Sequence, residues 1–280
     1  MGAAKARKDR FLSEHPVCCF CGGTRKATTI DHVPNRAAFP GRHGPEGFEF
    51  PACSECQAAF RTEEHYFAFL VRVSDQDGAN YDSQTSQRLI RGIRNNLPEM
   101  LPIVRLSSNE KRRAMRKMGL TLPPGTFYRE LPLAAFPANS DEMIRKIAIK
   151  IGLALFYRQK GHSAPSHFDC CACWTPQSDL KKIAAWKEFA ADFQGIEWGS
   201  RRNIEFGNRF RYGWSEEATG LPEIFMSIAE FGHSLAICTL IWDPALGPEV
   251  NRGPGTISVL AWAKKDFPEN WLGSNRTRKS

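Results

Sequence analysis

The sequence CCFCGGTRKATTIDHVPNR at residues 18–36, followed by PACSEC at residues 51–56, decides the fold that we expect for this chain. It contains two Cys-x-x-Cys pairs that are separated by 31 residues. Two such pairs can bring four thiolates together tetrahedrally around Zn²⁺. Glycines directly after the first pair suit the tight turn of a metal-binding knuckle. We therefore predict a structural zinc site formed by four cysteines: Cys18, Cys21, Cys53 and Cys56.

The residues between the two cysteine pairs predict two short strands, and the residues after the second pair predict a helix. Residues 27–33 are rich in β-forming side chains and end at Pro34, which cannot continue a central β-ladder. Residues 48–50 alternate apolar and acidic side chains, as a short strand does. A helix is expected to start near Thr62, which can cap it, with two acids in its first turn. The expected order is strand, loop, strand, knuckle and helix.

This order of motifs resembles the HNH endonuclease family, whose core is a ββα-metal motif that is often braced by four cysteines. The matching residues are the four cysteines, the Asp31-His32 pair and Pro34, in the pattern CxxC…DHxP…CxxC. The resemblance covers about residues 16–72, a quarter of the chain. The flanking words ATTIDHVP and FPACSEC are similar to bacterial and phage proteins of the same kind.

The resemblance implies a metal-dependent endonuclease that hydrolyses phosphodiester bonds in DNA. By the family comparison, His32 would be the general base that activates water, a task that suits a neutral imidazole near pH 7. Asp31 would bind a catalytic divalent cation, Mg²⁺ or Mn²⁺, which offsets the charge that develops on the leaving oxygen. The zinc would be structural and remote from the bond that is broken.

Gln57 stands where the family has Asn or His as the second ligand of that cation. Its side chain is one methylene longer than Asn, which moves the amide oxygen about 1–1.5 Å outward. The stretch SECQ at residues 54–57 also fits a capping box, in which Gln57 only caps a helix. Glu64 and His65 follow closely as other candidate ligands. The alternative to a nuclease is therefore a catalytically degenerate zinc-containing protein that binds nucleic acid.

The net charge of +8 is concentrated in residues 86–118, which hold 9 Lys and Arg against 2 Glu. A local basic stretch is typical of a nucleic-acid partner, DNA before RNA, because each neutralised phosphate releases counterions. A solvated helix face is the other interpretation, and a zinc-stabilised interaction module without nucleic acid is a third hypothesis. The candidate nucleic-acid contacts are basic side chains inside and outside this stretch: Arg36, Arg88, Arg91, Arg94, Lys111, Arg112, Arg113, Arg116 and Lys117.

The rest of the chain predicts a helical part followed by a β-rich part. Residues 140–160 form a broad apolar helix with Lys146, Lys150 and Arg158 as its charged side, and residues 180–193 form a second amphipathic helix. Three segments alternate or run apolar like strands of an antiparallel sheet: 206–214, 223–231 and 235–242. The fold class is therefore α+β, an N-terminal zinc-braced ββα-metal (HNH-like) module followed by helical segments and a C-terminal antiparallel β-rich region.

A second cysteine cluster leaves two interpretations open. Cys170 and Cys173 form another Cys-x-x-Cys pair, with His162 and His167 just upstream. These four residues predict either a second metal site or, more in keeping with their irregular spacing, a buried loop with reduced thiols.

Hydropathy and cysteine usage predict a cytoplasmic protein without a membrane partner. The longest apolar run, residues 235–242, is too short to span a bilayer, and residues 1–10 lack the apolar core of a secretory signal. Cysteines are then expected to stay reduced, with Cys19 as a spare thiol. We place a zinc-binding module at 1–75 and an α+β body, with its basic helical segment and β-rich end, at 76–280.

Overall fold

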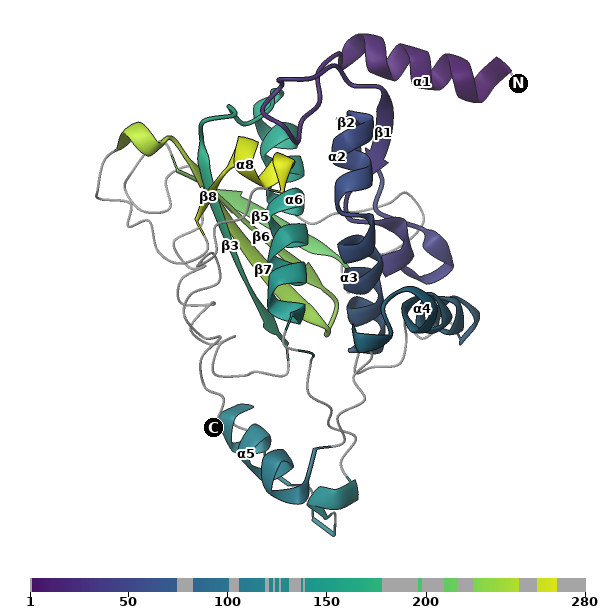
Figure 1. Cartoon of the computed structure of the whole chain (residues 1–280), viewed down its shortest axis with the longest axis vertical. Coiled ribbons are helices and arrows are strands. Elements are labelled where there is room, and N and C mark those ends of the chain that lie inside the picture. The colour runs from purple at the N-terminus through teal and green to yellow at the C-terminus, as the bar shows by residue number, and fades with distance from the viewer. Residues whose placement is uncertain are drawn as a thin grey trace.

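The structure is a computed structural model in which helices and antiparallel strands share one body (Figure 1). Mixed α and β structure, with a C-terminal antiparallel sheet, confirms the predicted class at that level. Among the described helices, none is long and apolar enough to cross a membrane. The structure describes residues 2–74, 83–100, 106–118, 121–122, 124–125, 127–130, 137, 139–177, 196–197, 209–215, 224–246 and 256–265.

The predicted order of strand, loop, strand, knuckle and helix is present in the N-terminal part. Strands β1 (Thr29–His32) and β2 (Glu49–Ala52) pair antiparallel, with Asp31 opposite Phe50. The loop between them contains two short 3-10 turns, and two helices follow β2. Their bounds are η1 Arg36–Ala38, η2 Pro40–Arg42, α2 Ser54–Ala59 and α3 Arg61–Val73. Helix α3 begins one residue before Thr62, and Phe60 precedes it without a side-chain cap, so the predicted Thr62 cap is wrong.

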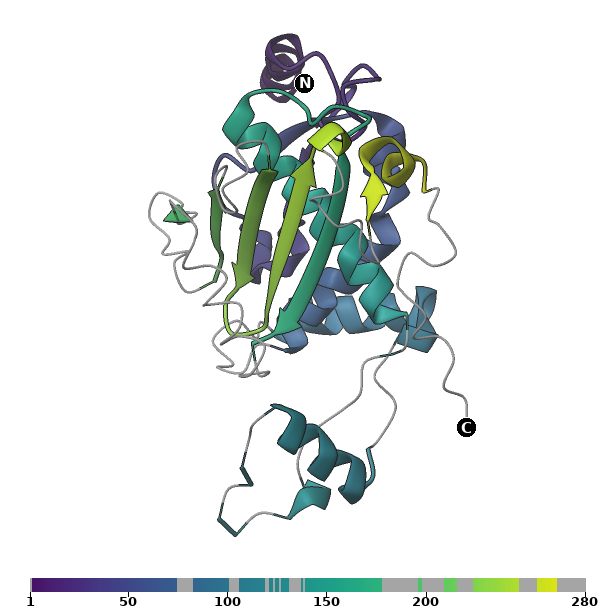
Figure 2. The same ribbon diagram turned by 90° about the vertical axis from the view of Figure 1, so that its left-hand side faces the viewer.

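The C-terminal strands form one antiparallel sheet with the order β4-β5-β6-β7-β3-β8 (Figure 2). Strands β6 and β7 confirm two of the three predicted segments, and β5 covers the end of the third. The strand bounds are β3 Asp169–Pro176, β4 Ile196–Glu197, β5 Arg211–Ser215, β6 Ile224–Phe231, β7 Leu235–Trp242 and β8 Ile257–Ser258.

Strand β3 corrects the prediction of a buried loop around the second cysteine cluster. It pairs with β7 along its full length, from Asp169 opposite Trp242 to Pro176 opposite Leu235. Thiols behave as small apolar groups, so a run of cysteines can fill a strand in the middle of a sheet. The β-pattern was not visible in the sequence because neighbouring cysteines hide the alternation of inward and outward side chains.

Helix α6 (Ser140–Lys160) is the central element of the molecule. It lies between the sheet on one side and α3 on the other (Figures 1 and 2). Its close approach to β7 requires Gly152, because a Cβ there would lie 2.3 Å from Thr239 Cγ2. The predicted helix over 140–160 is confirmed, and Gly161 ends it in the left-handed conformation. Because packing surrounds α6, its predicted charged side is wrong for Lys150, which is fully buried.

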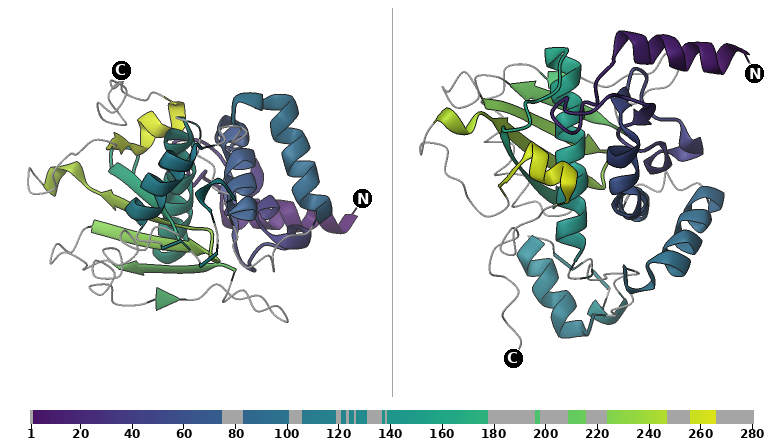
Figure 3. Two further views of the ribbon diagram at one scale, coloured as in Figure 1. Left: turned by 90° about the horizontal axis from the view of Figure 1, so that it is seen from below. Right: turned by 45° about the horizontal axis from the view of Figure 1, so that its top comes forward.

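The basic helices α4 (Ser83–Asn96) and α5 (Ser108–Met118) carry the positive stretch found in the sequence. Helix α4 packs on α3, and its Leu89 and Ile93 are buried (Figure 3). Helix α5 contacts the short turn η4 (Tyr128–Glu130). The remaining described elements are α1 Gly2–Glu14, η3 Pro98–Met100, η5 Pro244–Leu246 and α8 Val259–Lys264. The predicted helix over 180–193 lies outside the described residues.

One hydrophobic core joins the N-terminal hairpin to the C-terminal sheet. It runs without interruption from Cys18 in the first knuckle to Ala263 in α8. The boundary that the sequence suggested at residues 75 and 76 lies outside the described residues, and the segments on either side of it share this core. The hairpin is therefore held from behind by α6, which positions the candidate site.

Candidate functional site

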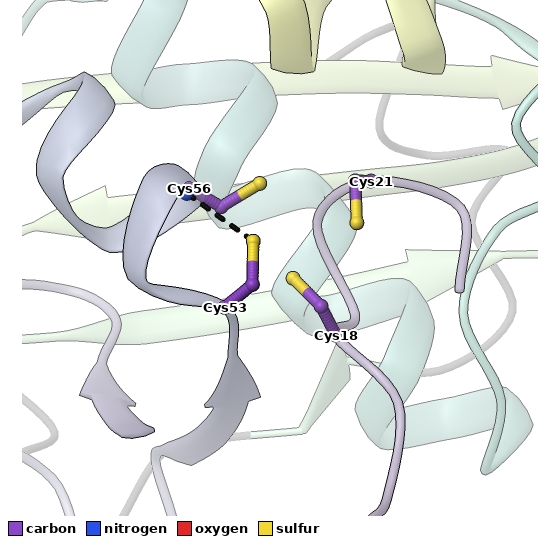
Figure 4. Close-up of side chains that lie close together, drawn as sticks. All are labelled: Cys18, Cys21, Cys53 and Cys56. Atoms are coloured by element: carbon purple, nitrogen blue, oxygen red, sulfur yellow. Dashed lines mark hydrogen bonds between the residues drawn. The ribbon is translucent and has the colours of Figure 1, made fainter. Parts of the chain in front are cut away.

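The four predicted cysteines converge on one point at the end of the hairpin (Figure 4). Cys18 and Cys21 come from the knuckle before β1, whereas Cys53 follows β2 and Cys56 lies in the first turn of α2. Their Sγ atoms all lie within 4.8 Å of one another, and all four residues are buried. Tetrahedral Zn–S bonds of about 2.3 Å would place the sulfurs about 3.8 Å apart. The cluster could therefore hold a metal ion such as zinc.

Local backbone geometry supports such an ion. The backbone N–H of Phe20 donates to Cys18 Sγ and that of Cys56 donates to Cys53 Sγ, each at 3.4 Å. Gly22 has a φ of +68°, and a Cβ there would meet the backbone of Ser166 at 2.4 Å. Without a metal, the hydrogen bond with Cys21 is the largest cause that raises the pKa of Cys18 to about 12. A bound cation would instead favour the thiolates, which are the form that binds metal.

Asp31 lies on the inner face of β1, within a buried ion cluster. Its Oδ2 accepts from Lys150 Nζ of α6 at 2.7 Å, and the same ammonium donates to Glu64 Oε1 of α3 at 2.5 Å. Asp31 Oδ1 accepts from the backbone N–H of His32, and Glu64 Oε2 accepts from Asn35. The Lys150 ammonium therefore contacts the Asp31 carboxylate, which the motif pattern assigned to a catalytic cation.

The charges in this cluster hold one another in place. Burial lowers the pKa of Lys150, but the carboxylates of Asp31 and Glu64 outweigh it and the net pKa is raised. Burial also raises the pKa of Glu64, an effect that the Lys150 ammonium opposes. The sequence analysis placed Lys150 on the charged side of the helix over 140–160, and only the packing of α6 against the hairpin shows its role.

Of the other candidate cation ligands, Glu64 shares Lys150 with Asp31, whereas Gln57 and His65 have different partners. Gln57 Nε2 donates to the carbonyl oxygen of Ile30 at 3.4 Å, which ties α2 to β1. The capping-box interpretation of residues 54–57 is wrong, because Cys53 Sγ caps α2. His65 faces α4, where a Cβ on Gly92 would lie 2.4 Å from its ring, and burial lowers its pKa.

His32 lies on the opposite face of β1 and lines a cavity of about 620 Å³. Its Nε2 is 3.6 Å from Glu49 Oε1, and Arg36 contacts the same carboxylate at 3.6 Å. Burial, followed by the nearby Arg36 guanidinium, lowers the pKa of His32, so its imidazole is neutral near pH 7. The lining residues that carry charge or titrate come from α1, β1, β2 and the intervening loop: Arg7, His32, Arg36, Arg42, His43, Glu46 and Glu49.

The basic residues of 86–118 that the structure describes do not line this cavity. Arg88, Arg91 and Arg94 are exposed on α4, and Arg112, Arg113, Arg116 and Lys117 are exposed on α5; none of these seven lines the cavity. Lys111 is buried and donates to the carbonyl oxygen of Arg129 at 3.0 Å. Its role is therefore to hold α5 against η4, which corrects its assignment as a nucleic-acid contact.

The second cysteine cluster does not form a metal site among the described residues. Within the described ranges, a group of three or more possible ligands is made only by Cys18, Cys21, Cys53 and Cys56. Cys170 is buried, with its Sγ directed to the carbonyl oxygen of Ile257, whereas Cys173 is exposed. His162 contacts the carbonyl oxygen of Ser163, and His167 lies 4.0 Å from Asp243.

Comparison of the chain with protein-family models, with curated proteins and with solved structures gives no match. The resemblance to HNH endonucleases thus stays a prediction from the motif pattern.

Proposed function

We propose that this chain hydrolyses phosphodiester bonds in nucleic acid, DNA before RNA, with His32 as the general base. One observation carries the proposal: the partly exposed imidazole of His32, whose pKa is lowered by burial, lines a cavity to which Arg7, Arg36 and Arg42 also contribute. Guanidinium groups bind phosphate oxygens through paired hydrogen bonds. A neutral imidazole beside them can take a proton from water.

The reaction follows from this arrangement. A nitrogen of His32 takes a proton from a water molecule, whose oxygen forms a bond to phosphorus. The bond from phosphorus to the leaving ester oxygen breaks, its electron pair stays on that oxygen, and the oxygen takes a proton from solvent. Arg36 and Arg42 face the charge that grows on the phosphoryl group, and Glu49, 3.6 Å away, offsets the charge of the imidazolium.

The metals enter this proposal in different ways. Zinc at the four cysteines would be structural, and it would hold the end of β2 and the start of α2 beside the first knuckle. The motif pattern implies Mg²⁺ or Mn²⁺ as the catalytic cation, with Asp31 and Gln57 as ligands, but these two side chains do not fit that role in this structure. Lys150 contacts Asp31 and the Ile30 carbonyl accepts from Gln57, so the requirement for the cation is part of the test.

The test is cleavage of plasmid DNA by the zinc-loaded chain with added Mg²⁺, with Mn²⁺ and with neither. We expect His32→Ala to reduce the rate at least about 100-fold while zinc content and melting temperature stay unchanged. His43→Ala is the matched control, since it removes an imidazole from the same cavity. Equal cleavage by the His32→Ala variant, or no cleavage by the wild-type chain under any condition, would contradict the proposal.

A second candidate is a catalytically degenerate protein that binds nucleic acid at the same cavity. The ion pair between Asp31 and Lys150 favours it, because a cation bound there would have to displace a buried ammonium. This candidate predicts salt-dependent binding of DNA without turnover, and no effect of Mn²⁺ on melting temperature. Binding and cleavage measured on the same oligonucleotide separate the two functions.

A further inference from the structure

Helix α1 carries four basic side chains next to the His32 cavity. Lys5, Arg7, Lys8 and Arg10 occupy two turns, and Asp9 is the one acid between residues 2 and 10. All the residues from 2 to 10 are exposed, and Arg7 is the one that reaches the cavity lining. The cavity therefore continues into a basic helix surface.

The described contacts of α1 with the body lie at the middle of the helix and at its C-terminal end. Phe11 and Leu12 are half-buried, and His15 Nδ1 lies 2.8 Å from the Tyr157 hydroxyl on α6. Arg7 pairs with Glu49 of β2. Figures 1 and 3 show the first turns of α1 extending away from the body. These contacts thus fix the direction in which the charged turns project.

Helix stability does not explain these charges. Lys5 lies at the positive end of the helix dipole, where a cation is unfavourable, and the first turn of α1 holds no acid. No residue of α1 is buried, and an isolated helix of 13 residues is marginal in water. A polyanion bound along these turns would offset both the charge repulsion and the lack of packing.

We propose that α1 is an arm that binds the phosphate backbone of the same DNA duplex that enters the cavity. The inference rests on the proposed function and adds a binding surface to it. With 3.6 residues per turn, Lys5 and Lys8 share one side of α1 and Arg7 and Arg10 share another, so each side presents two cations about 4.5 Å apart along the helix axis. Duplex DNA carries closely repeated phosphates that such cations can neutralise. The continuity of the helix surface with the cavity through Arg7 favours the nucleic acid bound there over a separate acidic protein.

The test is the triple variant Lys5→Ala, Lys8→Ala and Arg10→Ala in the zinc-loaded full chain. Binding to a fluorescent DNA duplex is measured by anisotropy between 50 and 300 mM KCl, a range of about six-fold in salt. We expect the slope of log affinity against log salt to fall by about 2.7, which is 0.9 for each lost phosphate contact, and the affinity at 100 mM to fall about tenfold or more. Arg7 is kept because it belongs to the cavity.

A matched control removes three exposed cations elsewhere: Arg129→Ala, Lys160→Ala and Lys264→Ala. An equal loss in this control would overturn the inference, because net charge alone would then explain the effect. Unchanged affinity in the α1 variant, with weaker binding by an Arg36→Ala and Arg42→Ala variant, would overturn the arm and leave the cavity function intact. Absence of salt-dependent binding in the wild-type chain would overturn the proposed function itself.

Discussion

Asp31 and His32 are consecutive residues of β1, and they face two different environments. Asp31 points into the protein, where Lys150 and Glu64 complete an ion cluster behind the hairpin. His32 points to the cavity, where guanidinium groups and solvent surround it. Successive side chains of a strand alternate between its faces, so one Asp-His pair serves both regions. The face of β1 that carries Asp31 therefore stabilises the fold, whereas the face that carries His32 borders the cavity proposed for catalysis.

The largest expected effect comes from removing the metal at the four cysteines, because its loss would release the hairpin and so disrupt the contacts on both faces of β1. We expect zinc chelation, or Cys56→Ser, to lower the free energy of unfolding by more than about 5 kcal/mol, since binding to a structural site is also folding free energy. Thermal unfolding with and without chelator measures it, together with zinc content by mass spectrometry. Cys173→Ser, at an exposed position, is the control, and melting that is insensitive to chelator would refute a structural metal.

The next effect concerns only the inner face. Lys150→Met leaves the carboxylates of Asp31 and Glu64 buried beside each other, and we expect it to cost about 3–5 kcal/mol of folding free energy. Urea unfolding at pH 7 measures this loss. Lys160→Met, an exposed position on the same helix, should change stability by less than about 0.5 kcal/mol. Equal stability of the two variants would show that the buried cluster does not hold the hairpin.

Substitution of the two neighbours separately sharpens the comparison. We expect Asp31→Asn to destabilise the fold by about 1–3 kcal/mol, since one partner of a buried charged hydrogen bond is lost. His32→Ala should cost less than about 1 kcal/mol but remove cleavage. Unfolding and cleavage are measured on both variants. If Asp31→Asn instead kept full stability and lost cleavage completely, Asp31 would be a catalytic ligand and not part of the inner support.

The smallest effect is the pH dependence that His32, on the cavity side of β1, gives to stability and cleavage. The pKa of His32 is lowered in the folded state. As pH falls, this imidazole therefore takes up a proton at a higher pH in the unfolded chain than in the folded protein. The contribution of neutral His32 to stability is fully present above its pKa in the unfolded chain, about 6.5. This contribution is lost as the pH falls from that value through the pKa in the folded protein. Cleavage should decline over the lower part of this window, because the base must be neutral.

His32→Gln provides the control for this measurement. Burial lowers the pKa of His65 as well, so only the difference in unfolding free energy between wild type and His32→Gln reports on His32. An identical pH profile for the two proteins between pH 5 and 7.5, a window set around the ordinary histidine pKa of about 6.5, would contradict a lowered pKa at this position.

The cysteine spacing and the periodicity located much of the fold in advance. Cysteine spacing predicted the cluster, since two Cys-x-x-Cys pairs on either side of a hairpin leave few other geometries. The apolar face of residues 140–160 predicted α6, and the runs at 223–231 and 235–242 predicted β6 and β7. The strand at 169–176 was missed, because its cysteines carry no alternation of apolar and polar side chains.

The local chemistry of this protein was thus determined by the sequence alone: four sulfurs at knuckle spacing, a hairpin and an Asp-His pair on its first strand. The use of that pair was decided only by the tertiary structure. Lys150 lies 119 residues from Asp31, and Arg7 lies 25 residues before His32. No local pattern predicts which distant charges meet, because burial and packing of α6 and α1 against the hairpin set these contacts.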